Sequence, residues 1–149
     1  MEQGRLEAKL SMAGFAVAVL ALAAMFYGRA LFCPHPIVIG VQVAAALLMI
    51  WARLTFGMRS FHAAATPTAG GLVDRGPYRF WRHPIYAAIL YFVWAGALCH
   101  RTPLAWAGGV VITLALALRM AMEERLLRAQ MPGYSEYAAR TKRVLPFVL

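Results

Sequence analysis

The chain has 149 residues, of which 62% are hydrophobic and only 14% are charged, which excludes an intrinsically disordered or collagen-like protein. The 15 Lys and Arg residues against 6 Asp and Glu give a formal charge of +9, but they punctuate long apolar runs instead of lining a polar face. This distribution is typical of a polytopic membrane protein and argues against a soluble nucleic-acid-binding protein. We expect one all-α domain, residues 1–149.

Apolar stretches predict four transmembrane helices at residues 12–27, 36–52, 84–99 and from 103 until Pro132-Gly133. Each stretch is long enough to approach the roughly 30 Å hydrocarbon core at about 1.5 Å per residue. Pro84 and Pro103 are favourable first-turn residues for the helices that they begin. The last helix would be roughly 43 Å long, so we expect it to leave the hydrocarbon from about Glu123 onward and a helical tail to follow.

The basic residues lie mostly on one side of these predicted spans. Of the Lys and Arg residues, 13 fall before the first span, between residues 53 and 82, or from Arg119 onward, and 2, Arg29 and Arg101, fall on the other side. The positive-inside rule then places both termini, the 53–82 loop and the C-terminal tail in the cytoplasm. We therefore expect the functional site to face the cytoplasm.

The polar segment from Thr66 to Tyr86 is dense in Gly, Pro, aromatic and cationic residues. It could be an interfacial segment in which Tyr78, Phe80, Trp81 and Tyr86 form an aromatic belt. It could also bind a ligand, because the helix that starts at His83-Pro84 presents unpaired N–H groups and a positive dipole end. Such an end suits a carboxylate or phosphate, with Arg82 beside it. The residues alone leave both interpretations open.

Arg119 lies within the fourth apolar run, where a charged side chain is a functional hypothesis by default. Glu123 follows one turn later on the same face, so the two could hold a ligand that carries an ammonium and a carboxylate or phosphate. The alternative is a structural ion pair between them. Glu124 followed by Arg128 has the better orientation for such a pair, and that pair fits a structural role better.

Cys33, His35, Cys99 and His100 fall on the predicted outer side. The two cysteines could form a disulfide if that compartment is oxidising, although their spacing does not establish their distance. We expect no metal site there. Gln42 in the second span indicates an interhelical hydrogen bond more than a ligand contact.

The segments Gly76-Pro77-Tyr78-Arg79 and Arg82-His83-Pro84-Ile85-Tyr86 resemble the cofactor motif of the isoprenylcysteine carboxyl methyltransferase family and its phospholipid-methyltransferase relatives. The likeness extends to residues 51–53, 57–61, 123–127, 134–137 and 143–147, and covers roughly residues 45–149. The family motif often continues with a glycine where this chain has Ala88. The small number of spans is closer to the bacterial members than to the eukaryotic ones.

This resemblance implies an S-adenosylmethionine-dependent methyltransferase of the bacterial inner membrane, with its cofactor region at about residues 70–149. Arg119 and Glu123 would be the catalytic residues, with Arg119 orienting the methyl acceptor. The acceptor would be a lipophilic molecule from the membrane, most simply one with a carboxylate. The residues that would bind the cofactor are Tyr78, Arg82, His83, Pro84, Tyr86, Glu123 and Glu124.

Alternative functions differ in the chemistry that they need. A carboxylate acceptor is ionised at neutral pH and needs only a cation to position it, whereas a phospholipid amine must lose a proton. Glu123, His83 and Tyr78 are candidate bases for that step. An NADPH-dependent membrane reductase resembles this family in its cofactor region but is longer. A non-catalytic membrane subunit would leave Arg119, Glu123 and the 82–86 motif unexplained.

Overall fold

The protein is all-helical in its computed structural model, which describes residues 2–57 and 72–144. Residues 58–61, 66–71 and 145–147, which contribute to the predicted loop and to the family likeness, lie outside the described residues. The elements in chain order are α1 (Glu2–Tyr27), α2 (Pro36–Phe56), η2 (Gly76–Arg79), α3 (Pro84–His100), α4 (Pro103–Gln130) and α5 (Tyr134–Arg140).

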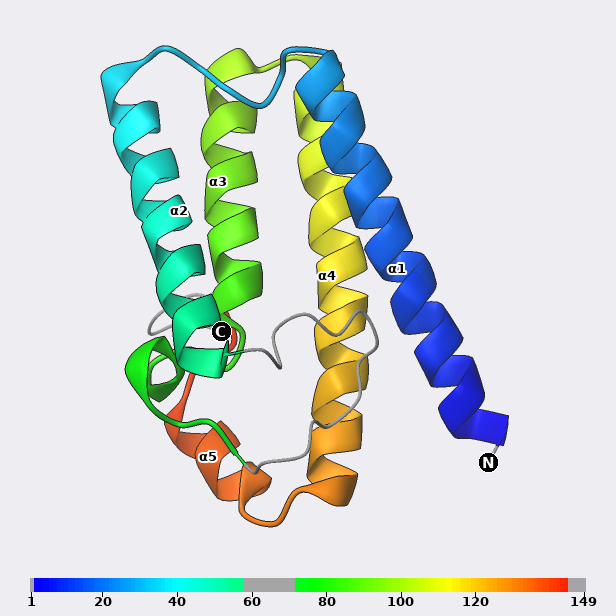
Figure 1. Ribbon diagram of the computed structural model, residues 1–149. Helices are drawn as coiled ribbons and strands as arrows, with labels where there is room; N and C mark the ends of the chain where they lie inside the picture. The colour runs from blue at the N-terminus through cyan, green and yellow to red at the C-terminus, as the bar shows by residue number, and fades with distance from the viewer. Residues whose placement is uncertain (1, 58–71, 145–149) are drawn as a thin grey trace.

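Helices α2, α3 and α4 run side by side, and α1 packs on α4 but tilts away from it toward the N-terminus (Figure 1). An assembly of long helices is what the sequence predicts for a polytopic membrane protein. Three stretches are long and apolar enough to cross a membrane: Lys9–Tyr27, Pro36–Phe56 and Pro103–Gln130. The helix α3 is also apolar but has 17 residues, about 26 Å at the helical rise. The predicted spans are thus confirmed as helices, although α1 begins earlier and α2 ends later than their apolar runs, because the helical backbone continues into polar sequence.

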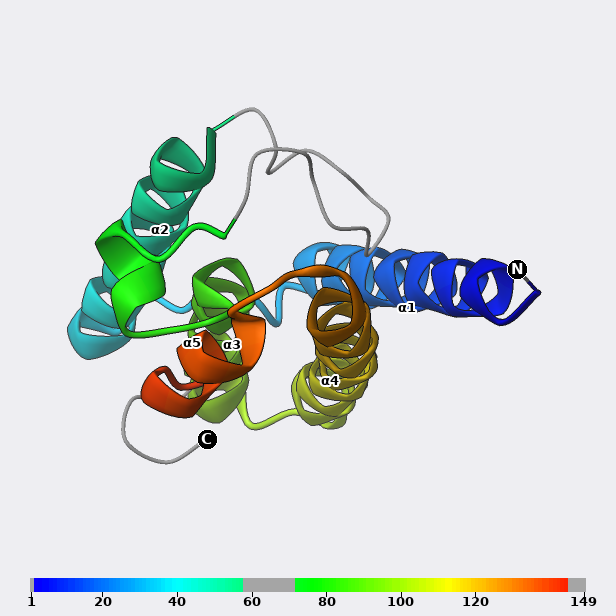
Figure 2. The ribbon, with the colours of Figure 1, turned by 90° about the horizontal axis from the view of Figure 1, so that it is seen from below.

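The four long helices form an open arc in the order α2, α3, α4, α1. The helix α2 packs along α3, α1 packs along α4, and α3 and α4 join the two pairs. Figure 2 shows α2 and α1 at the two ends of this arc. Their outer faces expose large apolar side chains such as Leu20, Ile37 and Leu54, which in water would be a large unpaired apolar surface. In a membrane, lipid chains would cover this apolar surface, so the arc fits an integral membrane protein.

A proline begins each of α2, α3 and α4, as expected because the first N–H groups of a helix have no internal partner. Thr102 adds a side-chain cap to α4, where its hydroxyl accepts a hydrogen bond from the amide of Ala105. These prolines determine where each span starts. Pro84 in particular is buried and places the 82–86 motif at the beginning of α3.

At the end of the bundle opposite α5, several contacts close the α1–α2 connection onto α3. Cys33 and Cys99 form a disulfide with a Cα–Cα distance of 6.4 Å, which settles the alternative that the spacing left open. His100 Nε2 lies 2.7 Å from the carbonyl of Phe32. The Gln42 amide donates to the carbonyls of Leu31 and Phe92, which confirms the predicted interhelical hydrogen bond.

Gly96 allows the close approach of this connection to α3. A Cβ at residue 96 would lie 2.1 Å from the carbonyl oxygen of Leu31. Because that neighbour is backbone, we expect Gly96→Ala to lower the free energy of unfolding by about 1–3 kcal/mol. The matched control is Gly40→Ala on α2, where a Cβ meets nothing within 4 Å. Thermal unfolding of both variants in detergent checks this, and a Gly96→Ala protein that melts at the wild-type temperature would contradict it.

Candidate functional site

The segment that precedes α3 is hydrogen-bonded to the segment that follows α5. The amide of Arg82 donates to the carbonyl of Lys142, and the amide of His83 donates to the carbonyl of Arg143 at 3.1 Å. The amide of Lys142 in turn donates to the carbonyl of Phe80. This pairing brings the 82–86 motif and the C-terminal segment together beside the last turns of α4.

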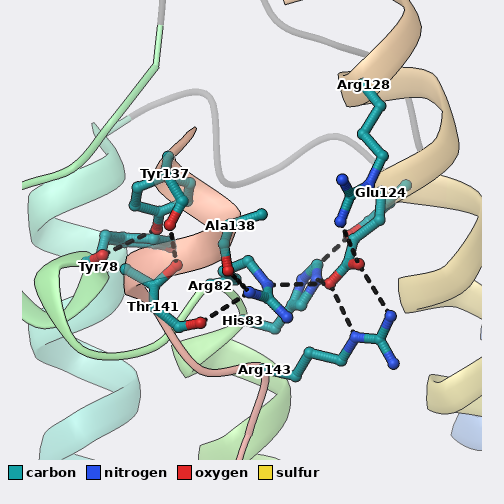
Figure 3. A network of polar contacts seen from close by, with 10 residues as sticks. Tyr78, Arg82, His83, Glu124, Arg128, Tyr137, Ala138, Thr141 and Arg143 are labelled. Carbon is teal, nitrogen blue, oxygen red and sulfur yellow. Dashed lines mark hydrogen bonds and ion pairs between the residues drawn. The ribbon is translucent and has the colours of Figure 1, made fainter. Parts of the chain in front are cut away.

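Glu124 is the centre of the ion network that results (Figure 3). Its side chain is only 4% exposed, and its Oε1 lies 3.1 Å from Arg82 Nε and 3.3 Å from His83 Nε2. Arg143 donates to both of its oxygens, from Nε and Nη2, each at 3.1 Å. The predicted partner Arg128 lies farther away, at 4.0 Å. Both carboxylate oxygens of Glu124 are therefore occupied by the protein's own donors.

Arg82 connects this network to α5. Its Nη1 donates to the carbonyl of Thr141 at 2.7 Å and to the carbonyl of Ala138 (Figure 3). These are carbonyls at the C-terminal end of α5, where a cation satisfies both the unpaired acceptors and the helix dipole. The Arg82 guanidinium thus binds Glu124 and the end of α5 at once.

Glu123 belongs to a second cluster, which shares His83 with the first. The Tyr86 hydroxyl donates to Glu123 Oε1 at 2.5 Å and accepts from Arg119 Nε at 2.6 Å. Arg119 Nε also lies 3.3 Å from Glu123 Oε1, the predicted pair one turn apart. His83 Nδ1 lies 3.6 Å from Glu123 Oε2, and its ring stacks on that of Tyr86 at 5.5 Å between centroids. Glu123 is 19% exposed, so it is more accessible than Glu124.

Arg119 is buried within the bundle, where its side chain is 4% exposed. Its Nη1 donates to the carbonyl of Ser11 on α1, and its guanidinium lies 5.3 Å from the centre of the Phe15 ring. These contacts were not predicted from the sequence, because a backbone carbonyl leaves no signal in residue type. The first helix therefore takes part in holding the intramembrane arginine.

Tyr78 in η2 stands apart from both clusters. Its ring packs against Phe56 of α2, and its carbonyl accepts a hydrogen bond from the Tyr137 hydroxyl at 2.8 Å. Burial raises the pKa of the Tyr78 hydroxyl well above its ordinary value. The hydroxyl therefore keeps its proton at neutral pH, which argues against the expectation that Tyr78 serves as a base.

The two clusters together carry an excess of positive charge. The guanidinium groups of Arg82, Arg119, Arg128 and Arg143 face the carboxylates of Glu123 and Glu124, which leaves a net charge of +2. Arg128 and Arg143 are about half exposed, so this excess of positive charge is accessible and suits ligands that carry anionic groups. Within residues 2–57 and 72–144, no three His, Cys, Asp or Glu side chains are grouped to hold a metal ion.

The different surroundings of the two glutamates predict different effects of neutralisation. Glu124→Gln would leave the guanidinium groups of Arg82 and Arg143 facing each other without the charge between them. We expect this variant to lose about 3 kcal/mol of stability. Glu123→Gln removes the countercharge of Arg119 but leaves the hydrogen bonds of that guanidinium to Tyr86 and Ser11, so it should lose less. Thermal unfolding of both variants measures the two stability losses. Equal losses would contradict the assignment of Glu124 as the centre of the ion network.

Comparison with known proteins gives a match to one family. The model of the isoprenylcysteine carboxyl methyltransferase family matches residues 37–129, more than half of the 149-residue chain. The matched part runs from α2 through the 82–86 motif to Arg119, Glu123 and Glu124 on α4. No curated protein and no solved structure matches the chain. With its all-helical membrane architecture, the chain belongs to the isoprenylcysteine carboxyl methyltransferase family and is a membrane methyltransferase.

Proposed function

We propose that the protein transfers a methyl group from S-adenosylmethionine to the carboxylate of a lipophilic, isoprenylcysteine-like acceptor. The observation that carries this proposal is the cluster of Arg119, Tyr86 and Glu123, which places a buried cation and an accessible carboxylate side by side on a membrane helix. Membership in the family supports the reaction class. A polar cofactor from the cytoplasm and an acceptor from the bilayer could both reach this end of the bundle.

The donor groups of the site fit the amino-acid and aromatic parts of S-adenosylmethionine. We assign Glu123 to the cofactor's ammonium group, because the oxygens of Glu124 already accept hydrogen bonds from Arg82 and Arg143. The stacked rings of His83 and Tyr86 offer an aromatic surface for the adenosyl part. We assign a positioning role to Pro84, Arg82 and Glu124. They hold the start of α3 against α4 and thereby orient the residues that contact the cofactor.

When bound, the cofactor supplies a methyl group that its sulfonium already activates. What remains for the protein is to orient the acceptor and to exclude water. Arg119 uses Nε and Nη1 for Tyr86 and Ser11, and a guanidinium has five N–H donors, so further donors remain for an acceptor carboxylate. Arg119 is therefore the residue that we assign to the acceptor.

The geometry favours a carboxylate acceptor over a phospholipid amine. An amine acceptor has to lose a proton to a base, whereas a carboxylate acceptor does not. Of the candidate bases, Glu123 accepts from Tyr86 and pairs with Arg119, both ring nitrogens of His83 face the two glutamates, and Tyr78 keeps its proton. A membrane reductase and a non-catalytic subunit gain no support, because the matching family is one of methyltransferases.

We also propose that the site faces the cytoplasm of a bacterial inner membrane. The exposed basic side chains of Arg125, Arg128, Arg140 and Arg143 lie at the site end of the bundle, as the positive-inside rule requires. The disulfide lies at the opposite end, and disulfides persist in oxidising compartments such as the periplasm. Two independent features thus support the same orientation.

The cofactor assignment predicts that Glu123→Gln and His83→Ala each weaken the binding of S-adenosylmethionine and of its demethylated product by at least about tenfold. Isothermal titration calorimetry on the detergent-purified protein measures this. The control is Arg140→Gln, which removes an exposed pair with Asp74 and should bind like the wild type. A folded wild-type protein that binds neither compound would overturn the proposed function.

The orientation predicts that Cys33 and Cys99 are bridged in cells. A maleimide-linked polymer added to denatured membranes should modify neither cysteine before reduction and both cysteines after it, because the chain contains only these two. The shift in gel mobility shows how many cysteines carry the polymer. Cys99→Ala is the control, because it leaves one thiol that reacts without reduction. Two thiols that react fully without reductant would place this end in a reducing compartment and contradict the orientation.

A further inference from the structure

Tyr134, the first residue of α5, has a buried hydroxyl that the described part of the chain leaves without a hydrogen-bond partner. Tyr134 as a whole is only 2% exposed. Buried polar groups in folded proteins are nearly always paired, because an unpaired one loses the hydrogen bonds that it makes to water. A partner supplied by a ligand would account for this hydroxyl.

The position of Tyr134 places its hydroxyl beside the charged cluster. Tyr134 belongs to a small buried cluster against which Leu127 of α4 packs, and the guanidinium of Arg128 lies 5.9 Å from the centre of the Tyr134 ring. Burial, and next to it the nearby carboxylate of Glu124, raises the pKa of the Tyr134 hydroxyl to about 12. At neutral pH the hydroxyl is therefore a hydrogen-bond donor next to the ion network.

Tyr137 provides the contrast within the same helix. It is equally buried, at 3% exposed, and its ring lies 5.8 Å from that of Tyr134. Its hydroxyl, however, donates to the carbonyl of Tyr78. The hydroxyl of Tyr137 thus has a hydrogen-bond partner in the protein, whereas that of Tyr134 has none within the described residues.

We infer that Tyr134 is a further cofactor-binding residue, whose hydroxyl donates a hydrogen bond to the carboxylate of the methionine part of S-adenosylmethionine. This inference rests on the proposed function. The carboxylate is favoured because Arg82, Arg128 and Arg143 surround the single charge of Glu124, which leaves excess positive charge near the hydroxyl. The cofactor's ammonium would lie toward Glu123, the preceding residue on α4. Residue 134 falls outside the segment that the family model matches.

The experiment compares Tyr134→Phe with Tyr137→Phe, since each variant removes one hydroxyl and keeps the ring. Calorimetric titrations use S-adenosylhomocysteine and 5′-deoxy-5′-methylthioadenosine, which lacks the carboxylate and the ammonium. We expect Tyr134→Phe to weaken the binding of S-adenosylhomocysteine about tenfold and to leave that of methylthioadenosine unchanged. We expect Tyr137→Phe to leave both affinities unchanged.

Thermal unfolding of the ligand-free variants gives an independent readout. Tyr134→Phe should melt at or above the wild-type temperature, because it deletes a buried hydroxyl that has no partner. Tyr137→Phe should melt at a lower temperature, because the carbonyl of Tyr78 loses its donor.

Wild-type affinity of Tyr134→Phe for S-adenosylhomocysteine would overturn the inference, as would an equal loss for both compounds. If the folded wild type binds neither compound, the proposed function fails and the inference fails with it.

Discussion

A carboxylate buried at the end of a membrane helix is stable only when cations reach it, and Glu124 imposes this constraint on the rest of the protein. Its cations come from segments far apart in the chain, Arg82 before α3 and Arg143 after α5. To deliver them, the C-terminal segment has to return along the start of α3, where backbone hydrogen bonds hold it. The position of α5 follows, because Arg82 binds the carbonyls at its end. One buried charge thus organises the whole end of the bundle where the candidate site lies.

Glu123 and Glu124 are neighbours in the sequence but have different surroundings, because successive residues on a helix point about 100° apart. Glu124 is directed at the arginines of the ion network, whereas Glu123 is directed at Tyr86 and Arg119. His83 lies between the two, with one ring nitrogen near each carboxylate. The rigid network therefore stands directly behind the more accessible cluster. This arrangement holds the groups of the candidate site in place before any ligand arrives.

Burying Arg119 in a membrane helix is costly, and the fold offsets this cost with local partners. Glu123 supplies the countercharge, the Tyr86 hydroxyl and the Ser11 carbonyl accept hydrogen bonds, and the Phe15 ring covers one face. Two of these partners come from α1, which lies outside the matched family segment. At the opposite end, the disulfide and the close approach at Gly96 hold the α1–α2 connection on α3. The bundle is thus held together at both ends, and a buried apolar cluster that includes Val93, Ile112 and Leu116 packs between them.

The all-helical membrane architecture, the order of the spans and their proline starts follow from the sequence, because apolar runs, charge asymmetry and first-turn prolines are local properties. The sequence also singled out Arg119 and Glu123, since a charge inside an apolar run and a spacing of one helical turn are visible in one dimension, whereas His83 and Tyr86 were indicated as cofactor-binding residues by the family resemblance. Three facts come from the tertiary structure alone: Cys33 meets Cys99, Glu124 rather than Glu123 is surrounded by cations, and Arg143 and Ser11 contact the two charged clusters. Those facts depend on which distant segments come together, and the spacing of residues along a chain does not encode the distances between their side chains.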